Sequence, residues 1–361
     1  MDIHIVPGVK AKDVAEAHSK DLFIQEHHNC KCMTYWIDEQ RENIFCLIEA
    51  PEKEAVEEMH RRAHGLIPNK IIEVSNALVE SFLGRIYDPQ NAEITDDGLK
   101  VFNDAGFRIL LVTKTTDPVL LQNELGAEKA NELLSTHNNI IRKNIAAYSG
   151  REAEHEGSGF IISFTSAAKA VACALAIQKE IKQDASALGF KIGINAGEPV
   201  ESSNKMFGDT IQHAKNLCSI AEGSQIAICS RVKELVTKDF FQNDKKYFLS
   251  LSPNDEALLQ LLFSKLEENW QNADFDMSEY CQAVAMSTSQ LYRKTIALTG
   301  LSPNILLKEY RLEKAKELMK KQRYSIAQIT YDAGFTSASY FTKCFKKKYG
   351  LLPMAYLDML H

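Results

Sequence analysis

The spacing of apolar positions changes character close to Leu251 of this 361-residue chain. Before that point, short apolar runs and two-residue alternations are interspersed with stretches of helical period, which predicts strands and helices in mixed units. Beyond it the pattern is helical throughout, beginning with Asp255–Trp270. A chain of this length has room for two or three domains, so we expect a multidomain α+β protein whose last domain is all helical.

Residues 1–85 are expected to form the first domain. Its predicted elements are a strand at Asp2–Val6, a helix at Lys12–Glu26, strands at Cys32–Ile37 and Ile44–Glu49, a helix at Pro51–His64 and a strand at Ile71–Val74. This order of elements, βαββαβ, predicts a ferredoxin-like α/β sandwich. The polar stretch Tyr87–Gly98 contains Asp-Pro and Asp-Asp-Gly and is expected to be a linker.

Residues 100–240 are expected to form a second domain of the α/β class. Its predicted strands are Arg108–Thr113, Phe160–Phe164, Lys191–Asn195 and Gln225–Cys229, and its predicted helices are Lys129–Tyr148, Ala167–Gln183 and Ile211–Ala221. The short apolar runs and the longer helical stretches are distinguished by their period and length.

Residues 252–361 contain the same unit twice, fifty positions apart, and are expected to form the third domain. One copy has Leu291-Tyr292-Arg293-Lys294, Gly300 and Pro303, and the other has Phe341-Thr342-Lys343-Cys344, Gly350 and Pro353. Gly suits the left-handed position after a helix, and Pro prevents the helix from continuing. A helix and a tight turn precede each copy, at Met277–Ala285 and at Ser325–Ala333. Two helix-turn-helix units fit adjacent major grooves of a duplex.

Charge and composition narrow the possible functions. The whole chain carries a net charge of −6, but residues 276–361 hold 13 Lys and Arg against 7 Asp and Glu, so this end carries +6 and the remainder −12. Such asymmetry is typical of an end that faces nucleic acid, although a solvated helix face has the same composition. No apolar run approaches 18 residues, so we expect no membrane span. The absence of a secretory segment at the start and the eight scattered Cys predict a cytoplasmic protein.

Short motifs in the C-terminal domain add to this interpretation. They are Met286-Ser287, Arg311-Leu312-Glu313-Lys314-Ala315, Ile326-Ala327-Gln328-Ile329, Ala333-Gly334-Phe335, Ser339-Tyr340-Phe341 and Phe345-Lys346-Lys347-Lys348-Tyr349-Gly350. Together they resemble the AraC family of transcriptional regulators over roughly residues 252–361. Thr295 and Ile296 depart from the family pattern, which usually has Phe and then a polar residue at these two positions.

The residues expected to contact DNA lie on the second helix of each unit. They are Ser289, Tyr292 and Arg293 on the first recognition helix and Ser339, Thr342, Lys343 and Lys346 on the second. Arg can bind a guanine edge through two hydrogen bonds, whereas Lys346 is expected on a phosphate.

The middle domain carries a different set of motifs. They are Gly157-Ser158-Gly159-Phe160, Ala172–Gln178, Ile192-Gly193-Ile194-Asn195-Ala196-Gly197-Glu198, Phe207-Gly208-Asp209-Thr210-Ile211 and Gly223-Ser224-Gln225-Ile226. In this order they resemble the class III adenylyl and guanylyl cyclase homology domain. The resemblance places Thr113 and Ser158 where the family has metal-binding carboxylates, Gln212 at the Asn position and Asn216 at the Arg position. Neutral groups cannot hold two Mg²⁺ ions, so we expect no catalysis. The domain could still pair two chains or bind a nucleotide or another small molecule.

The first domain is rich in potential metal ligands, because six of the ten His lie in its first 64 residues. His60 and His64 project from one face of a helix, and His4 on the first strand could face the same helix. Cys46 and Glu49 lie on opposite faces of a regular strand, so only a bulge would let both bind one ion. Cys30 and Cys32 form a Cys-x-Cys pair that could bind a metal, but such a pair is more often incidental than a pair of ligands. His18 shares an apolar face with Val14 and Leu22. The competing interpretation is that His60 and His64 are solvated.

The stretches Asp2–Val9, Phe45–Pro51 and His60–Gly65 resemble small ferredoxin-like proteins described as nickel-binding. The expected ligands are therefore His4, His60, His64, Cys46 and Glu49, with nickel as the first candidate and copper or zinc as alternatives. We expect a cytoplasmic, homodimeric, non-enzymatic transcription regulator that binds double-stranded DNA and senses a metal or a small ligand. The alternatives are a nucleotide cyclase with a DNA-binding tail and a metal-buffering protein.

Overall fold

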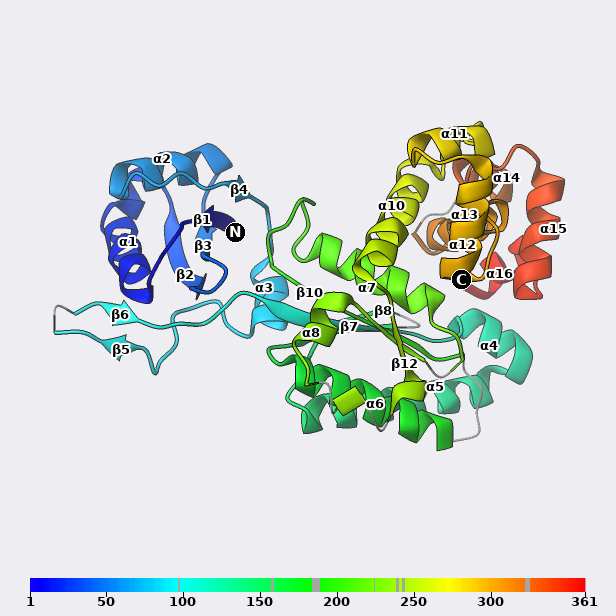
Figure 1. Cartoon of the computed structure of the whole chain (residues 1–361), viewed down its shortest axis with the longest axis horizontal. Coiled ribbons are helices and arrows are strands. Elements are labelled where there is room, and N and C mark those ends of the chain that lie inside the picture. Colours follow the sequence, from blue (N-terminus) through cyan, green and yellow to red (C-terminus); the bar gives the residue numbers. More distant parts are fainter. Residues whose placement is uncertain are drawn as a thin grey trace.

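The computed structural model describes residues 1–96, 98–156, 159–183, 189–223, 225–237, 240–241, 244–321 and 325–360. An N-terminal unit (blue), a middle unit (cyan to green) and a helical C-terminal unit (yellow to red) follow one another along the chain (Figure 1). The predicted multidomain α+β class is therefore confirmed. The domain limits of 1–85, 100–240 and 252–361 stay a prediction.

The N-terminal unit has the predicted order of strands and helices. Its elements are β1 (Asp2–Ile5), α1 (Ala11–Ile24), the short 3-10 helix η1 (Gln25–His28), β2 (Lys31–Asp38), β3 (Asn43–Glu49), α2 (Lys53–Ala63) and β4 (Lys70–Ile71). The strands pair antiparallel in the order β2-β3-β1-β4, with α1 and α2 packed together beside the sheet. This is the ferredoxin-like arrangement that the βαββαβ order predicts.

Successive side chains along β1 and β3 point to opposite faces of this sheet, so the two faces have different contacts. Asp2 and Cys46 are paired across the two strands and point toward the helices. Ile3 and Phe45, also paired, point to the opposite face and join a buried core that includes Phe207 of the middle unit. The N-terminal sheet is therefore packed between its own helices and the middle unit.

The segment predicted as a linker is partly structured. The helix α3 (Asn76–Leu83) precedes it, and its second half forms a hairpin in which β5 (Glu93–Ile94) pairs with β6 (Lys100–Val101), just beyond the segment. Gly98 in the turn has a φ of +83°, a conformation that suits Gly, which explains how a polar stretch closes a hairpin. Phe102, directly after β6, stacks on Tyr35 of β2 with ring centroids 4.2 Å apart, and this contact holds the hairpin against the N-terminal sheet.

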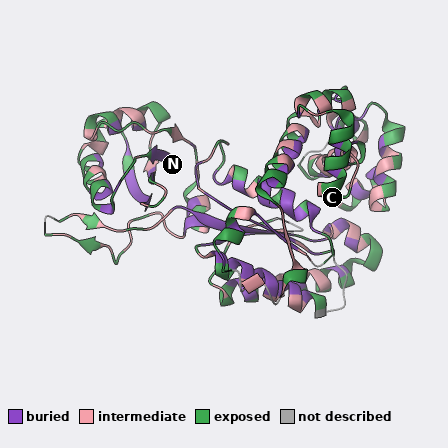
Figure 2. Ribbon diagram, in the orientation of Figure 1, coloured by how far each residue is buried: buried purple, intermediate pink, exposed green. Residues whose placement is uncertain are grey.

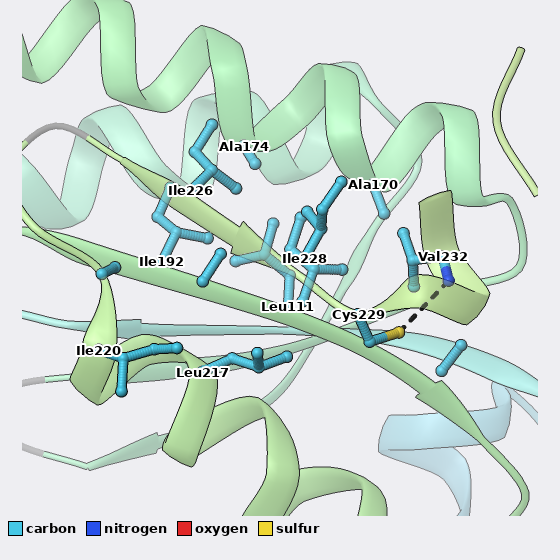
Figure 3. Close-up of a cluster of buried hydrophobic side chains, with 14 of the residues drawn as sticks. Leu111, Ala170, Ala174, Ile192, Leu217, Ile220, Ile226, Ile228, Cys229 and Val232 are labelled. Atoms are coloured by element: carbon cyan, nitrogen blue, oxygen red, sulfur yellow. Dashed lines mark hydrogen bonds between the residues drawn. The ribbon is translucent and has the colours of Figure 1, made fainter. Parts of the chain in front are cut away.

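The middle unit is built on a six-stranded sheet in the order β12-β11-β10-β7-β9-β8. Its elements are β7 (Arg108–Lys114), α4 (Pro118–Leu125), α5 (Ala127–Ala147), β8 (Arg151–Glu156), β9 (Gly159–Phe164), α6 (Ala167–Gln183), β10 (Lys191–Gly197), α7 (Gly208–Ile220), β11 (Ile226–Ile228), α8 (Ser230–Glu234), the 3-10 helix η2 (Lys245–Tyr247) and β12 (Phe248–Ser250). Helices α5 and α6 lie on one side of the sheet and α7 on the other. Figure 3 shows Leu111 and Ile192 of the central strands between Ala174 of α6 and Leu217 of α7.

Five of the described elements of this unit were not predicted, namely β8, α4, β12, α8 and η2. Strand β8 reads Arg-Glu-Ala-Glu-His-Glu and lies at the edge of the sheet, where charged side chains remain solvated and apolar alternation is not required. Helix α4 and strand β12 are short, so their patterns are too brief to recognise.

The C-terminal unit consists of helices in the described residues. They are α10 (Pro253–Asn269), α11 (Met277–Ala283), α12 (Thr288–Thr299), α13 (Pro303–Lys321), α14 (Ile326–Asp332), α15 (Ala338–Tyr349) and α16 (Pro353–Leu360). The pairs α11–α12 and α14–α15 are the two predicted helix-turn-helix units, joined by α13. Gly300 and Gly350 end α12 and α15 with φ of +71° and +76°, as the Gly-then-Pro pattern predicts.

The C-terminal unit is attached to the middle unit at two places. Leu262 of α10 and Leu291 of α12 belong to the core that fills the middle unit, which fixes the first helix-turn-helix. Val119 of α4 belongs to the core of the second, with Phe341 and Phe345. Figure 2 shows buried residues along these contacts and within the sheets. No helix among the described residues has the length and apolarity needed to cross a bilayer.

Candidate metal centre and DNA interface

Four of the five predicted metal ligands converge between the sheet and the helices of the N-terminal unit. His4 lies on β1, Cys46 on β3, and His60 and His64 lie at the end of α2. The ring centroids of His4 and His60 are 4.9 Å apart, and those of His60 and His64 are 5.0 Å apart. The i,i+4 spacing on α2 therefore presents both imidazoles to the strand that carries His4, as the sequence predicted.

Two carboxylates that the sequence analysis did not select complete the cluster. The potential ligand atoms form two groups, each within 4.8 Å, namely Asp2, His4, Cys46 and His60, and Asp21, His60 and His64. Asp2 lies two residues before His4, and this spacing in an alternating strand is a signal that could have identified it. Asp21 comes from α1, and no local signal links it to residues on α2.

His60 is the centre of the cluster because both of its ring nitrogens face a carboxylate. Its Nδ1 lies 3.1 Å from Asp21 Oδ1 and its Nε2 lies 3.2 Å from Asp2 Oδ2. Burial would lower the pKa of His60, but the hydrogen bonds to Asp2 and Asp21 raise it to about 9. The ring is therefore a cation near neutral pH, with one N–H directed at each carboxylate, and a metal ion that binds either nitrogen would have to displace that proton.

Asp21 and His4 have the protonation states that a cation would need, whereas Cys46 does not. Burial favours the neutral acid of Asp21, but hydrogen bonds from His60 and His64 lower its pKa to about 2. Burial lowers the pKa of His4, so this imidazole is neutral, and its Nδ1 has no hydrogen-bond partner among the described residues. Burial raises the pKa of the Cys46 thiol, which keeps its proton unless a metal displaces it.

The shape of the site fits one small ion. A cavity of about 20 Å³ lies between these side chains, and Val14, His18 and Tyr35 also line it. A space of this size holds a single water molecule or ion. Imidazole nitrogens, carboxylates and a thiol suit Ni²⁺, Cu²⁺ or Zn²⁺ better than Mg²⁺ or Ca²⁺. The buried, unpartnered nitrogen of His4 is consistent with a ligand that completes its contacts.

Other candidates of the first domain lie outside this cluster. Glu49 is exposed at the end of β3, opposite Lys31. The Cys32 thiol is buried and lies 3.7 Å from the sulfur of Met59, so it packs as a small apolar group. His18 lines the cavity, but its Nε2 lies 3.9 Å from Asp88. Glu49 was predicted because the stretch Phe45–Pro51 resembles nickel-binding proteins, and the alternation of β3 directs its side chain away from that of Cys46.

The predicted DNA-contacting residues lie on the outer surface of α12 and α15. Ser289, Arg293, Ser339, Lys343 and Lys346 are exposed, Tyr292 is 43% exposed, and Thr342 is partly buried. Ser287 caps α12 in a capping box with Gln290, and Ser337 caps α15 by accepting a hydrogen bond from the N–H of Tyr340. Both helices thus begin at a defined residue, with their first turns accessible.

Thr295 is the residue at which α12 departs from the family pattern. Its side chain is fully buried, and its hydroxyl oxygen has no hydrogen-bond partner within the described chain. A buried hydroxyl without a partner costs stability, but it leaves α12 intact.

Three of the four residues that the sequence resemblance placed at cyclase catalytic positions form internal contacts. The Thr113 hydroxyl accepts a hydrogen bond of 2.9 Å from the N–H of Phe160, and the Gln212 amide donates to Asn216 at 3.0 Å. Ser158, the fourth predicted position, lies outside the described residues.

Helix α13 of the C-terminal unit covers the chain just beyond Thr113. Lys114 pairs with Glu313 at 3.2 Å. Asp117, which is buried, pairs with Lys316 at 3.4 Å and with Lys320 at 3.0 Å. This end of β7 is therefore a junction with the C-terminal unit.

Comparison with known families agrees with this geometry. Residues 280–359 match the family described as "Helix-turn-helix domain", and residues 1–74 match "Nickel responsive protein SCO4226-like". The C-terminal domain is an AraC-type helix-turn-helix domain. Together the two matches span the N-terminal unit, which carries the histidine cluster, and both helix-turn-helix pairs.

Individual relatives resemble mainly this AraC-type domain. The chain is 37% identical to histidine kinase P4 of Formosa agariphila over 108 residues, which is 30% of this chain and 8% of the kinase. It is 29% identical to the virulence regulon transcriptional activator VirF of Yersinia enterocolitica over 149 residues, which is 39% of this chain and 54% of VirF. The chain thus spans about half or less of these curated relatives.

A solved cyclase structure is similar to part of the chain. The guanylyl cyclase Cya2 is 22% identical, with a TM-score of 0.31, and the match covers 37% of this chain and 79% of the cyclase. This likeness is too low to establish the fold, so the cyclase-like interpretation of residues 100–240 stays a prediction.

Proposed function

We propose that this protein is a cytoplasmic, metal-responsive transcription regulator that binds double-stranded DNA as a homodimer. The observation that supports this most is the buried cluster of His4, His60 and His64 with two carboxylates, in a chain that also carries an AraC-type domain. One end of the chain is suited to hold a cation, and the other presents two accessible recognition helices. A chain with both parts is suited to change its DNA binding when the cation is bound.

The proposed ligands of the metal are His4, His60 and His64 with Asp2, Asp21 and Cys46. Nickel is the first candidate because the N-terminal unit matches a nickel-responsive family, and copper or zinc suit the same donors. When bound, the ion supplies positive charge that replaces the proton of His60 between the two carboxylates. Glu49, exposed at the end of β3, is left out of this set.

The proposed DNA contacts are those predicted from the sequence. Arg293 and Lys343 lie exposed on equivalent faces of α12 and α15, where each can reach a base edge, and Lys346 lies farther along α15 where a phosphate contact is expected. The α13 helix sets the separation of the two recognition helices, so both units can engage one face of a duplex.

The middle unit is proposed to pair two chains rather than to catalyse a reaction. Thr113 and Asn216 offer a neutral hydroxyl and amide where a metal-dependent cyclase requires charged groups. The ion pairs of Asp117 with Lys316 and Lys320 also place the AraC-type domain over the end of β7. A nucleotide or another small molecule remains a candidate ligand elsewhere in this unit.

The decisive experiment measures DNA affinity of the full chain with and without Ni²⁺, Cu²⁺ and Zn²⁺. We expect one metal to change the affinity by about 5- to 150-fold, the usual range of coupling between two sites. The variant His60→Gln should bind DNA without responding to metal, and His27→Gln, at an exposed histidine of η1, is the matched control. Equal DNA affinities with and without each metal, despite metal binding, would favour a buffering role, and formation of a cyclic nucleotide from ATP or GTP would favour the cyclase alternative.

A further inference from the structure

Lys70 forms an unusual contact between the N-terminal and middle units. Its ammonium group donates to three successive backbone carbonyls, those of Glu201 at 2.7 Å, Ser202 at 2.5 Å and Ser203 at 2.6 Å. An ammonium group has three hydrogens, so this contact uses its whole donor capacity. The position of Lys70 therefore determines the position of residues 201–203.

Lys70 is tied to the strand that carries two of the proposed metal ligands. It lies on β4, where it pairs with Ile3 of β1, between Asp2 and His4. The N–H of Asn69 donates to the Ile3 carbonyl at 2.8 Å. A displacement of β1 or of the segment that precedes β4 must therefore move Lys70.

A hydrogen bond to His64 holds the segment between α2 and β4, and metal binding by His64 would affect this bond. The N–H of Leu66 donates to Nδ1 of His64 at 3.2 Å, so this nitrogen is an acceptor and carries no hydrogen. If His64 binds a metal through Nδ1, the lone pair is no longer available to Leu66. If it binds through Nε2, the neutral ring carries its hydrogen on Nδ1, which opposes the Leu66 donor. Either mode breaks this hydrogen bond, which lies four residues before Lys70.

Residues 201–203 are in turn fastened to the first turn of α7. The Glu201 carboxylate accepts from the N–H of Thr210 at 2.9 Å, and the N–H of Ser203 donates to Asp209 at 3.1 Å. One turn later, His213 of α7 lies 2.8 Å from Glu256 of α10.

Helix α10 continues the connection into the AraC-type domain. Leu262 accepts a hydrogen bond of 3.0 Å from the Tyr280 hydroxyl of α11, and both belong to one core with Leu291 of the recognition helix α12. Contacts from His64 to α12 are therefore contiguous, through packed side chains and hydrogen bonds.

We propose that Lys70 is a positioning residue that transmits occupancy of the metal cluster to the AraC-type domain. Loss of the Leu66 hydrogen bond lets residues 65–69 change path, and Lys70 carries this displacement to residues 201–203, α7 and α10. The inference rests on the proposed function, since it names the route by which that regulation operates.

The test compares wild type, Lys70→Met and the control Lys12→Met, which alters an exposed lysine of α1. Nickel binding is measured by calorimetry, and amide hydrogen exchange of residues 203–210 is measured with and without nickel. In the wild type and in Lys12→Met we expect nickel to change exchange in this segment at least threefold. In Lys70→Met we expect nickel affinity within about threefold of wild type and no change of exchange beyond the N-terminal unit. Lys70→Arg, which retains a cationic donor, should recover part of the response.

DNA affinity provides the second readout. Nickel should change the affinity of wild type by about 5- to 150-fold and that of Lys70→Met by less than twofold. If Lys70→Met fails to fold, Lys70→Gln replaces it with the same expectations. Nickel binding without a change of exchange at 203–210, or an unaltered response in the Lys70 variant, would overturn the route while leaving metal regulation intact. Failure of wild type to bind nickel, copper or zinc would overturn the proposed function and the route together.

Discussion

The affinity of the N-terminal cluster for metal should rise with pH, because the proton of His60 competes with the ion. Hydrogen bonds to Asp2 and Asp21 raise the pKa of His60 to about 9. Since pH 7 lies about two units below this pKa, removal of the proton opposes metal binding. Compared with a site in which His60 is already neutral, the metal affinity is lower by about 100-fold, or ~2.7 kcal/mol. The His60 proton taken alone should make the affinity increase about tenfold per pH unit, and this contribution should level off as the pH passes the pKa of His60.

Cys46 provides a second test in the same titration. Burial raises the pKa of its thiol well above the ordinary value, so a metal that binds the thiolate releases a second proton over the whole range. The slope of log affinity against pH then has a value of about 2 at pH values below the pKa of His60 and about 1 at pH values above it. Cys46→Ser should reduce each slope by one, whereas His27→Gln, outside the cluster, should change neither.

The assay is calorimetry of Ni²⁺ binding between pH 6.5 and 9.5 in pairs of buffers with different ionisation enthalpies, which counts the protons released. An affinity that is independent of pH over this range would refute the competition between the metal and the His60 proton. A single released proton that is unaffected by Cys46→Ser would remove Cys46 from the ligand set.

The same shifted pKa values determine the stability of the metal-free protein. Since the folded pKa of His60 lies above its unfolded value, its contribution to the free energy of unfolding is fully present below about pH 6.5 and is lost as the pH rises through about 9. The folded pKa of Asp21 is about 2, below its unfolded value, so its contribution is present above about pH 4 and is lost as the pH falls through about 2. Urea unfolding of metal-free protein at pH 6 and pH 9.5 should show the first loss, and His60→Gln should abolish it.

Three further predictions concern the AraC-type domain and its junction. Arg293→Ala should reduce the free energy of DNA binding by about 1–3 kcal/mol and relax specificity at one base, whereas Lys346→Ala should weaken binding to all duplexes and lower its salt dependence. Both effects are measured by fluorescence anisotropy. A loss of affinity for Arg293→Ala that is equal for all sequences would assign Arg293 to a phosphate contact. Asp117→Asn keeps the cap of α4 but removes the buried carboxylate that Lys316 and Lys320 share, while Lys316 retains Glu313 at 3.4 Å, so the free energy of unfolding in urea should fall by about 1.5–3 kcal/mol, and a loss under 1 kcal/mol would show that the junction contributes little. Thr295→Val removes a buried, unpaired hydroxyl and should raise the free energy of unfolding by about 1 kcal/mol; a destabilised variant would mean that the hydroxyl is hydrogen-bonded.

Local patterns were sufficient to predict the AraC-type domain and the course of the N-terminal sheet. The Gly300 and Gly350 positions end their helices in the left-handed conformation, and Pro follows each, so the boundaries are set by residues in direct succession. The pairing of His60 with His64 was predicted for the same reason, because a helix brings residues four positions apart onto one face.

Packing between distant segments decided the rest. Asp21 reaches His60 only because α1 lies against α2, and its hydrogen bond, together with that of Asp2, keeps His60 protonated near neutral pH although burial opposes the charge. Val119 lies in the core of the second helix-turn-helix although α4 belongs to the middle unit in sequence. The sequence by itself determined which residues share a helix face or a strand face, since those periods are local. Only the tertiary structure decided which faces meet, because long-range contacts, desolvation and charge pairing depend on the whole fold, as the contact of Lys70 with three carbonyls of the middle unit illustrates.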